Sequence, residues 1–456
     1  MGFLSKRKWG RIDKRKWGKI LTIIYEIIKM LMVIIMKYLK RYIEKEIKDA
    51  LDTSGVVVVA GPKFCGKTTT CELFAKSKYA LDTKAKIQMV EANPEAILIG
   101  ANPRLIDEWQ NVPDLWNCAR SEVDHRDNKF GQFIFTGSST PADKADIYHS
   151  GSGRITTIKM RPMSLFETGE SKGQVSLEGL FKGKYKKLFI INEEYTLLDT
   201  AFYICRGGWP LSLVDDRNKA LRITSNYCST LFDFENSKNQ KFRNKKPEIF
   251  KMILRSYARN ISTEARKSVI INDVIQHDDR KLDEDTFDEY IEALQDLFII
   301  KDTEAWNPNF RSRTVIITSP TRHFIDTSVA IHALNMSPND LLNDSNTFGL
   351  MFEDFAIKEL SIYTNRLGGE IRHFRDGNGL ECDAVIHLPN GEYALVEIKL
   401  GGETLINDGI QKLNSLNEKI IENEQKVPAF KMIVIASGDA QIKEDTYIVP
   451  INMLKA

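Results

Sequence analysis

Apolar residues come in short unbroken runs through the first third of the chain, a pattern typical of strands buried on both faces of a parallel sheet. The four valines at 56–59 form the first run, followed by a turn at residues 61–62 and a helical pattern over residues 67–77. Further apolar runs end at residues 106 and 135. We therefore expect an α/β domain in which parallel strands alternate with helices.

The last third of the chain has a different spacing. An amphipathic helical pattern covers residues 348–360, and two apolar-rich strands, residues 380–387 and 393–399, flank a Pro-Asn-Gly turn. In the hairpin that this turn predicts, His387 pairs with Tyr393. We expect a second, smaller α/β domain here.

Between these two regions, residues 246–325 predict a winged-helix-like domain of three helices and a short hairpin. The helix at the recognition position, residues 283–297, contains no basic residue, and repulsion would keep its carboxylates away from phosphates. We expect a structural or protein-contact role for this helix, and Arg311, Arg313 and Arg322 of the hairpin are left as candidates for touching a nucleic-acid backbone. The seven carboxylates are Asp283, Glu284, Asp285, Asp288, Glu289, Glu292 and Asp296.

The segment GPKFCGKTT at residues 61–69 fits the pattern G-x-x-x-x-G-K-[ST], and it stands between a strand and a helix as phosphate binding requires. Its glycines let backbone N–H groups approach the phosphates, Lys67 reaches the β- and γ-phosphates, and the Thr68 hydroxyl ligates Mg²⁺. The predicted cofactors are ATP and Mg²⁺. The predicted nucleotide-binding residues are Gly61, Pro62, Lys63, Phe64, Cys65, Gly66, Lys67, Thr68, Thr69 and Thr136.

Two acidic residues follow an apolar strand about 40 residues later, as in a Walker B motif. Asp107 is expected to hold Mg²⁺ and Glu108 to polarise the attacking water. Thr136 and Ser138, at the end of the next strand, are alternative candidates for a sensor of the γ-phosphate or the attacking water, because strand ends face the ligand in such sheets. Arg154 and Arg161 are candidates for an arginine finger acting on a neighbouring subunit of a homo-oligomer; for each, a surface salt bridge is an equal alternative.

The C-terminal hairpin carries a second candidate site. Its register sets Asp383 opposite Glu397, and the two-residue period sends Lys399 to the same face. This D…E-x-K arrangement is that of restriction-endonuclease-like folds, in which carboxylates bind Mg²⁺ and the lysine orients water or stabilises the phosphate. Glu353 on the preceding helix is expected to complete the metal site. The alternative is a cross-strand salt bridge at a sheet edge.

Composition adds few constraints. The 456 residues suffice for about three domains, and the net charge of +2 predicts no partner by itself. The six cysteines form no C-x-x-C pair, which indicates a reducing compartment without structural zinc. We therefore expect a cytoplasmic protein.

The N-terminus leaves several interpretations open. Residues 6–13 and 14–21 nearly repeat one octad, and an apolar run with two charges continues to Met36. The run is short for a transmembrane helix, lacks the cleavage site of a signal peptide, and has the composition of a segment lying on a membrane surface. A further interpretation, which we favour, is that residues 1–35 are not native coding sequence and that Met36 is the functional start, so that membrane attachment is not expected.

Taken together, the motifs resemble prokaryotic AAA+-type ATPases whose C-terminal half carries a domain of unknown function. The resemblance implies ATP binding and hydrolysis, a helical lid over the nucleotide, and a second sensor at Arg206. Relatives usually carry Arg-Gln where this chain has Lys63-Phe64, which puts the local ligand contacts in doubt. The resembling motifs are GPKFCGKTT, LIDEWQ, FTGSS, GSGRITTIKMRPMSLFE, GGWP, SPTRHFIDT and the C-terminal ECDAVI…LVEIK.

The sequence thus predicts an α/β multidomain protein: an extension (1–35), a P-loop AAA+ core (36–165), a helical lid and linker (166–245), a winged-helix-like domain (246–325) and a restriction-endonuclease-like domain (326–456). One functional hypothesis is an ATPase switch regulating a nuclease-like domain that acts on DNA. The alternative is a non-catalytic, ATP-gated regulator or scaffold that recognises a protein or nucleic-acid partner. A membrane-associated ATPase is a third hypothesis and depends wholly on the extension.

Overall fold

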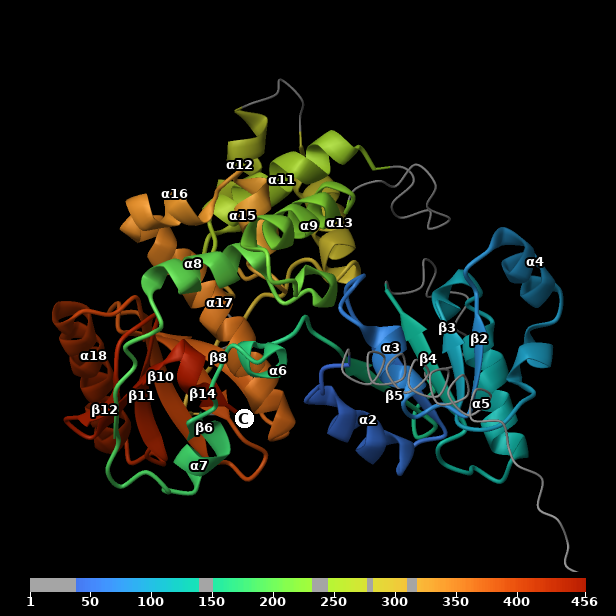
Figure 1. The fold of residues 1–456 in the computed structure, drawn as a ribbon, viewed down its shortest axis with the longest axis horizontal. Coiled ribbons are helices and arrows are strands. Elements are labelled where there is room, and N and C mark those ends of the chain that lie inside the picture. The colour runs from blue at the N-terminus through green and yellow to red at the C-terminus, as the bar shows by residue number, and fades with distance from the viewer. Residues whose placement is uncertain (1–37, 139–150, 232–244, 277–281, 310–317) are drawn as a thin grey trace, which may run out of the picture. The chain divides into compact units, whose positions relative to one another are not determined.

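The computed structural model describes residues 38–138, 151–231, 245–276, 282–309 and 318–456. The chain divides into two compact units, Met1–Lys40 and Arg41–Ala456, and every element labelled in Figure 1 belongs to the second. The octad repeat and the apolar run before Met36 lie outside the described residues. Within the described ranges, no helix combines the length and the apolar character that crossing a membrane requires.

The four valines at 56–59 are at most 3% exposed, as a strand covered on both faces requires. They belong to a parallel sheet of five strands in the order β2-β3-β4-β1-β5, which confirms the mixed α/β prediction. The strands are β1 (Val56–Ala60), β2 (Ser77–Ala80), β3 (Arg104–Asp107), β4 (Phe133–Gly137) and β5 (Ile155–Lys159).

Helices cover both faces of this sheet, and alternate side chains of β1 enter different cores. Val57 and Val59 share a core with residues of α2 and α3, whereas Val56 and Val58 share one with residues of α4 and α5. This alternation explains why the strand is apolar throughout. The helices are α2 (Ile43–Leu51), α3 (Lys67–Glu72), α4 (Lys84–Ala92) and α5 (Leu115–His125), and two 3₁₀ turns are η1 (Pro94–Leu98) and η2 (Trp109–Asn111).

The middle of the chain is helical, and the three helices expected in residues 246–325 are present. Antiparallel bridges Ile300↔Phe324 and Thr303↔Thr321 follow them, but the hairpin tip with Arg311 and Arg313 lies outside the described residues, so the winged-helix assignment stays a prediction. The helices are α8 (Leu197–Arg206), α9 (Arg217–Ser229), α11 (Pro247–Arg259), α12 (Lys267–Ile275), α13 (Glu284–Asp296), α15 (Ser328–Ala333) and α16 (Pro338–Asn343), and the turn η4 spans Pro210–Ser212.

Two expectations about this region need correction. Lysines from outside α13 pair with its carboxylates, Lys245 with Glu289 at 2.6 Å and Lys267 with Asp288 at 2.6 Å, so the acidic helix is partly offset. Arg322 is buried, and its guanidinium lies 2.5 Å from Asp302. That ion pair leaves Arg322 unavailable to a nucleic-acid backbone in this arrangement.

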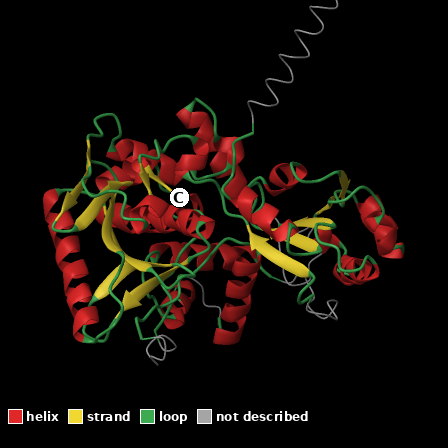
Figure 2. Ribbon diagram, turned by 90° about the horizontal axis from the view of Figure 1, so that it is seen from below, coloured by secondary structure: helices red, strands yellow, loops and turns green. Residues whose placement is uncertain are grey.

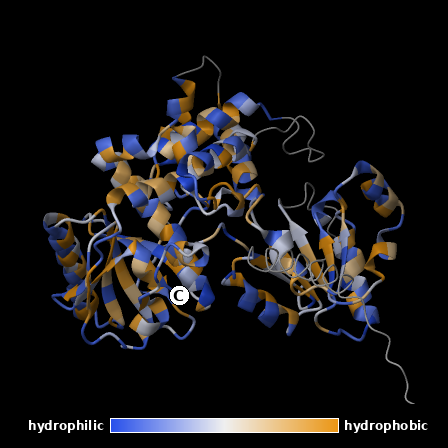
Figure 3. Ribbon diagram, viewed as in Figure 1, coloured by the Kyte–Doolittle hydropathy of each residue, from blue (hydrophilic) through white to orange (hydrophobic). Residues whose placement is uncertain are grey.

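The C-terminal region contains a seven-stranded mixed sheet in the order β7-β12-β13-β11-β10-β9-β8, and its strands are largely in the hydrophobic colour in Figure 3. Tyr393 pairs with His387 across β9 and β10, which confirms the expected register. Helices α17 (Ser345–Arg366) and α18 (Glu403–Glu422) contribute to the two cores of this sheet. Its strands are β8 (Glu370–Arg375), β9 (Glu381–His387), β10 (Tyr393–Lys399), β11 (Phe430–Ile435), β12 (Ala440–Lys443) and β13 (Thr446–Pro450), followed by the turn η5 (Ile451–Met453) and β14 (Leu454–Lys455).

The seventh strand of this sheet comes from far upstream. After α6 (Leu165–Thr168), strand β6 (Val175–Ser176) pairs with β14, and after α7 (Leu177–Phe181), strand β7 (Phe189–Ile190) pairs with β12. The expectation of a helical lid over residues 166–245 therefore does not describe the first part of that range, which is built into the C-terminal sheets. The two large sheets are the separate groups of yellow strands in Figure 2.

Candidate functional site

The phosphate-loop motif turns between β1 and α3, as the sequence predicts. Gly66 has φ +95°, a left-handed conformation that glycine adopts without strain, and it is the N-cap of α3. Lys67 is buried, and its Nζ donates to the carbonyl oxygens of Gly61 at 2.9 Å and Pro62 at 2.7 Å. The loop thus folds back on its own lysine.

Three predicted residues from three different elements meet beside this loop. Asp107 ends β3, and its Oδ1 accepts hydrogen bonds from the Thr68 hydroxyl at 2.9 Å and the Thr136 hydroxyl at 2.5 Å. Asp107 and Thr136 are register partners on β3 and β4, so the sheet itself sets their separation. A site for Mg²⁺ and phosphate requires hydroxyl and carboxylate groups close together, as they are here.

Glu108 follows Asp107 with φ +57°, which turns the chain sharply at the end of β3. Its Oε2 accepts hydrogen bonds from Ser138 at 3.1 Å and from the Gln110 amide at 2.5 Å. Gln110 was not predicted as a site residue, although its position two residues after Glu108 in LIDEWQ is a usable signal. Together Ser138 and Gln110 fix the carboxylate that is expected to polarise water.

The residues present fit a Mg²⁺ ion of the P-loop type, which needs one hydroxyl, one carboxylate, phosphate oxygens and water. The Thr68 hydroxyl and Asp107 supply the protein's part and already lie within 2.9 Å of each other. In the part of the chain that the structure describes, no group of three or more His, Cys, Asp or Glu side chains is arranged to hold a metal ion by itself.

The two candidate finger arginines lie at opposite ends of β5. Arg154 precedes the strand, and its carbonyl pairs with the N–H of Val56 at the start of β1, so Arg154 is at the edge away from the phosphate loop. Its guanidinium binds Asp124 at 2.8 Å. Arg154 therefore cannot touch a nucleotide bound to its own subunit, and its finger role remains a prediction for a neighbouring subunit.

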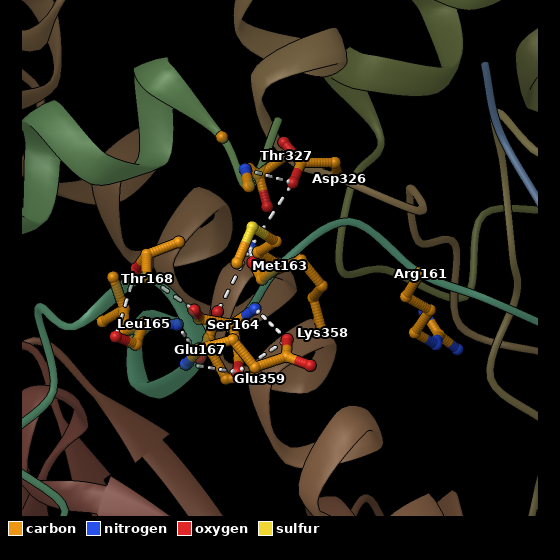
Figure 4. Close-up of polar contacts among 12 residues, drawn as sticks. Arg161, Met163, Ser164, Leu165, Glu167, Thr168, Asp326, Thr327, Lys358 and Glu359 are labelled. Carbon is orange, nitrogen blue, oxygen red and sulfur yellow. Dashed lines mark hydrogen bonds and ion pairs between the residues drawn. The ribbon is translucent and has the colours of Figure 1, made fainter. Parts of the chain in front are cut away.

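Arg161 follows β5 at the edge where the phosphate loop lies. Burial lowers the pKa of its guanidinium to about 10, and Asp354 opposes this shift. In Figure 4 its side chain points away from the contacts that join Met163, Lys358 and Glu359. Its finger role also stays a prediction.

The expected second sensor, Arg206, is already occupied. Its guanidinium pairs with Glu170 and donates to the carbonyl of Gly207 at 3.1 Å, and it is 6% exposed. A nucleotide would have to displace Glu170 to reach it. This arginine fastens the end of α8 to the segment after α6 and does not support the sensor role.

A buried polar network joins motifs that lie far apart in the sequence (Figure 4). Lys358 of α17 lies 3.1 Å from Glu359, 3.4 Å from Asp326 and 3.4 Å from the carbonyl of Met163. Asp326 accepts a hydrogen bond from the N–H of Gly208 at 2.9 Å. The MRPMSLFE, GGWP and HFIDT motifs therefore serve as packing and hydrogen-bonding partners of one another.

The C-terminal candidate residues meet as expected. The Nζ of Lys399 lies 3.2 Å from Oδ2 of Asp383 and 2.6 Å from Oε2 of Glu397. Asp383 also accepts a hydrogen bond from the N–H of Ile398 at 2.7 Å. Glu397 is fully buried, and although Lys399 is close, neither carboxylate oxygen has a well-oriented hydrogen bond within the described residues.

This arrangement shifts the pKa values of Glu397, Lys399 and Glu353. Burial and the charge of Asp383 together raise the pKa of Glu397 to about 7, although Lys399 opposes the rise. Burial lowers the pKa of Lys399, but the two carboxylates outweigh burial and raise it. Burial and Asp383 also raise the pKa of Glu353, a partly buried residue of α17. The structure therefore has the cross-strand salt bridge that was the alternative prediction. Lys399 lies between Asp383 and Glu397, where a metal ion would bind.

A cavity of about 750 Å³ lies elsewhere, against α2. Arg41, Arg161, Glu167 and Arg366 are among its lining residues, and none of the phosphate-loop residues lines it. This cavity is therefore not the nucleotide site. It does reveal a residue that sequence reasoning missed: Arg41, which belongs to no recognisable motif and whose side-chain hydrogen bonds all join it to residues far away in sequence.

Three family models match successive parts of the chain. Residues 53–169 match an AAA domain, residues 198–340 match a domain of unknown function (DUF8612), and residues 348–454 match another domain of unknown function (DUF4143). The AAA-domain match supports an ATP-binding ATPase core that contains the phosphate loop, Asp107 and Thr136. The two other family models describe domains of unknown function and therefore indicate no activity.

Among known proteins, the chain is 30% identical over 129 residues to the uncharacterized proteins Mb2031c of Mycobacterium bovis and Rv2008c of Mycobacterium tuberculosis. The match covers 27% of this chain and 29% of each relative. A STAND-class signal-transduction ATPase with a tetratricopeptide repeat sensor, PH0952 of Pyrococcus horikoshii, aligns with 73% of this chain and 50% of its own at 15% identity. Its TM-score is 0.23, so this likeness carries no argument.

Proposed function

We propose that this protein is a Mg²⁺-dependent ATPase switch that regulates a nuclease-like C-terminal domain acting on DNA. The meeting of Thr68, Thr136 and Asp107 beside the buried Lys67 is the observation that carries the ATPase part. These groups come from α3, β4 and β3, and a purely structural turn would not need them in one place.

In this proposal, Lys67 exchanges the carbonyls of Gly61 and Pro62 for the β- and γ-phosphates of ATP. Thr68 and Asp107 would hold Mg²⁺, which would supply charge neutralisation at the phosphates. Glu108, fixed by Ser138 and Gln110, orients the attacking water and accepts its proton.

The test is ATP binding and hydrolysis by the full chain with Lys67→Ala and Glu108→Gln, each with and without DNA. We expect Lys67→Ala to weaken ATP binding, and Glu108→Gln to keep binding while hydrolysis falls about 10²–10⁴-fold. Lys84→Ala on exposed α4 is the matched control and should behave as the wild type. Full hydrolysis by the Glu108→Gln protein would reject the assignment of the water-orienting residue.

The nuclease part rests on the order α17-β8-β9-β10-α18-β11 and on the cluster of Asp383, Glu397 and Lys399 at the end of the hairpin. The three carboxylates of Glu353, Asp383 and Glu397 are not arranged for a metal ion among the described residues, so cleavage would require Lys399 to leave Asp383 and Glu397 and the carboxylates to come together around the ion. The test is plasmid DNA with Mg²⁺ or Mn²⁺, with and without ATP. Glu397→Ala and Lys399→Ala should abolish cutting while ATP hydrolysis persists; cutting that survives both changes would exclude this site.

A second candidate function is a non-catalytic, ATP-gated regulator that recognises a protein or nucleic-acid partner. The position of Lys399, which is close to both Asp383 and Glu397 and lies where a metal ion would bind, favours it. Stable retention of ATP, with slow turnover and no cutting of DNA by the wild type, is the result expected from this function.

Homo-oligomerisation belongs to the same proposal, because Arg154 and Arg161 act as fingers only on a neighbouring subunit. Mixing Arg154→Ala or Arg161→Ala chains with Glu108→Gln chains should restore hydrolysis in mixed assemblies if the mutated arginine works across subunits. Activity that only adds up the two parental values would exclude the arginine tested.

A further inference from the structure

Arg41 is a buried arginine whose guanidinium touches three separate segments. Its Nη1 donates to the carbonyl of Cys65 at 2.8 Å and its Nη2 to the carbonyl of Arg161 at 2.8 Å. Its Nε donates to Oε1 of Glu167 at 3.1 Å, and the Arg41 side chain is 5% exposed. A planar guanidinium with several fixed donors can serve these three acceptors at once, whereas an ammonium group is a single point charge.

The contact with Cys65 bears on phosphate binding. Cys65 and Gly66 share a peptide group, and in a trans peptide the C=O and the N–H point in opposite directions. Because Arg41 holds the carbonyl of Cys65 on its own side of the loop, the N–H of Gly66 is directed to the other side. A Cβ on Gly66 would lie 3.5 Å from Nη1 of Arg41, so the arginine lies directly against the glycine.

Glu167 connects this arginine to the C-terminal region. Its Oε1 also accepts a hydrogen bond from the N–H of Tyr42 at 2.7 Å, and its Oε2 accepts one from the N–H of Ser164 at 2.8 Å. The next residue, Leu165, donates its N–H to Glu359 of α17 at 2.8 Å. The path from the phosphate loop to α17 therefore passes through buried, charge-assisted contacts only.

Helix α17 in turn carries Glu353 of the C-terminal candidate site, eight residues after its first residue and six residues before Glu359. A helix of this length moves as a rigid element, so a displacement at Glu359 is also felt at Glu353. Lys358 on the same helix holds Asp326, which extends the connection to the middle domain.

We propose that Arg41 is a positioning residue for the phosphate loop, and that the Arg41–Glu167 pair is the contact through which nucleotide binding is transmitted to α17. The proposal rests on the ATPase function proposed above and adds how that site is regulated. When ATP binds, its phosphates move the peptide group between Cys65 and Gly66. The Arg41 guanidinium moves with the Cys65 carbonyl, and the Arg41–Glu167 ion pair carries this displacement to α6 and α17.

The experiment compares the full-length wild type with Arg41→Lys, which keeps the charge beside Glu167 but cannot bridge three acceptors. Arg126→Lys, which alters a surface ion pair with Glu122, is the matched control. ATP affinity is measured by calorimetry, and hydrogen exchange of α17 is measured by mass spectrometry with and without saturating ATP. Should Arg41→Lys fail to fold, Glu167→Gln replaces it, because glutamine keeps the size of the side chain but removes the charge and one of the two accepting oxygens.

We expect Arg41→Lys to weaken ATP binding on the order of tenfold, which corresponds to the loss of about one good hydrogen bond. At saturating ATP, α17 should become more protected in the wild type and in Arg126→Lys, but not in Arg41→Lys. A merely structural role would change stability and leave the response of α17 to ATP intact. Wild-type affinity together with a wild-type response of α17 in Arg41→Lys overturns this proposal, whereas absence of ATP binding in the wild type overturns the ATPase function instead.

Discussion

Glu397 allows a quantitative test of the C-terminal cluster through pH. Its folded-state pKa of about 7 lies above the ordinary value of 4.5, because burial and Asp383 disfavour the ionised carboxylate more than Lys399 stabilises it. The folded state therefore binds the proton more tightly than the unfolded state, and the stability contributed by this group falls as pH rises from 4.5 to about 7 and then levels off.

The size of the effect follows from the two pKa values. Between about pH 5.5 and about pH 8.5, ionisation of Glu397 should cost the fold about 2 kcal/mol. Glutamine cannot ionise, so Glu397→Gln should gain about 2 kcal/mol relative to the wild type over this interval. Glu418→Gln, an exposed carboxylate on α18, is the control and should gain nothing.

Hydrogen exchange of β10 peptides in a urea series measures the local unfolding free energy in the relevant region. The measurement is made at both pH values for the wild type and the two variants. If the stability difference between Glu397→Gln and the wild type did not change with pH, Glu397 would not be a buried acid with a raised pKa. That result would refute the reasoning about the cluster.

Further predictions concern the same buried groups. Lys399→Met should raise the pKa of Glu397 above its present value, seen as a shifted carboxyl titration by NMR; an unchanged titration would contradict their coupling. Lys358→Met leaves two buried carboxylates without their cation and should destabilise the protein by about 3–5 kcal/mol in urea unfolding; a loss below about 1 kcal/mol would argue against the network. Gly208→Ala places a Cβ 2.1 Å from the carbonyl oxygen of Met163 and should lower the thermal midpoint markedly, where an unchanged midpoint would indicate that the backbone yields easily.

Local patterns in the sequence were sufficient for the parts of the fold that depend on near neighbours. The valine strand, the phosphate loop and the pairing of His387 with Tyr393 each follow from a few consecutive residues and their spacing, and the structure contains all three. The meeting of Asp107 with Thr136 follows from two strands lying side by side in a parallel sheet. Such features need no knowledge of the rest of the chain.

Contacts between distant segments were not predictable in the same way. Arg41 and Glu167 are separated by 126 positions, and nothing in either local sequence indicates the other. The same holds for the lysines that pair with carboxylates of α13 and for Glu170, which pairs with Arg206. Each of these partners lies outside the sequence motif on which the prediction was based. A motif defines which groups are available for chemistry, whereas their counter-ions depend on tertiary packing.

The two-residue strand β7 has a practical consequence for dividing this protein into parts. Its backbone closes the edge of the C-terminal sheet at Ala440 and Gln441, and β6 does the same for β14. A fragment that begins at residue 326 would expose these edges, and unpaired edges recruit other chains into aggregates. Residues 175–190 thus connect the P-loop region to the C-terminal sheets, so a C-terminal fragment that is moved between proteins should include these two short strands.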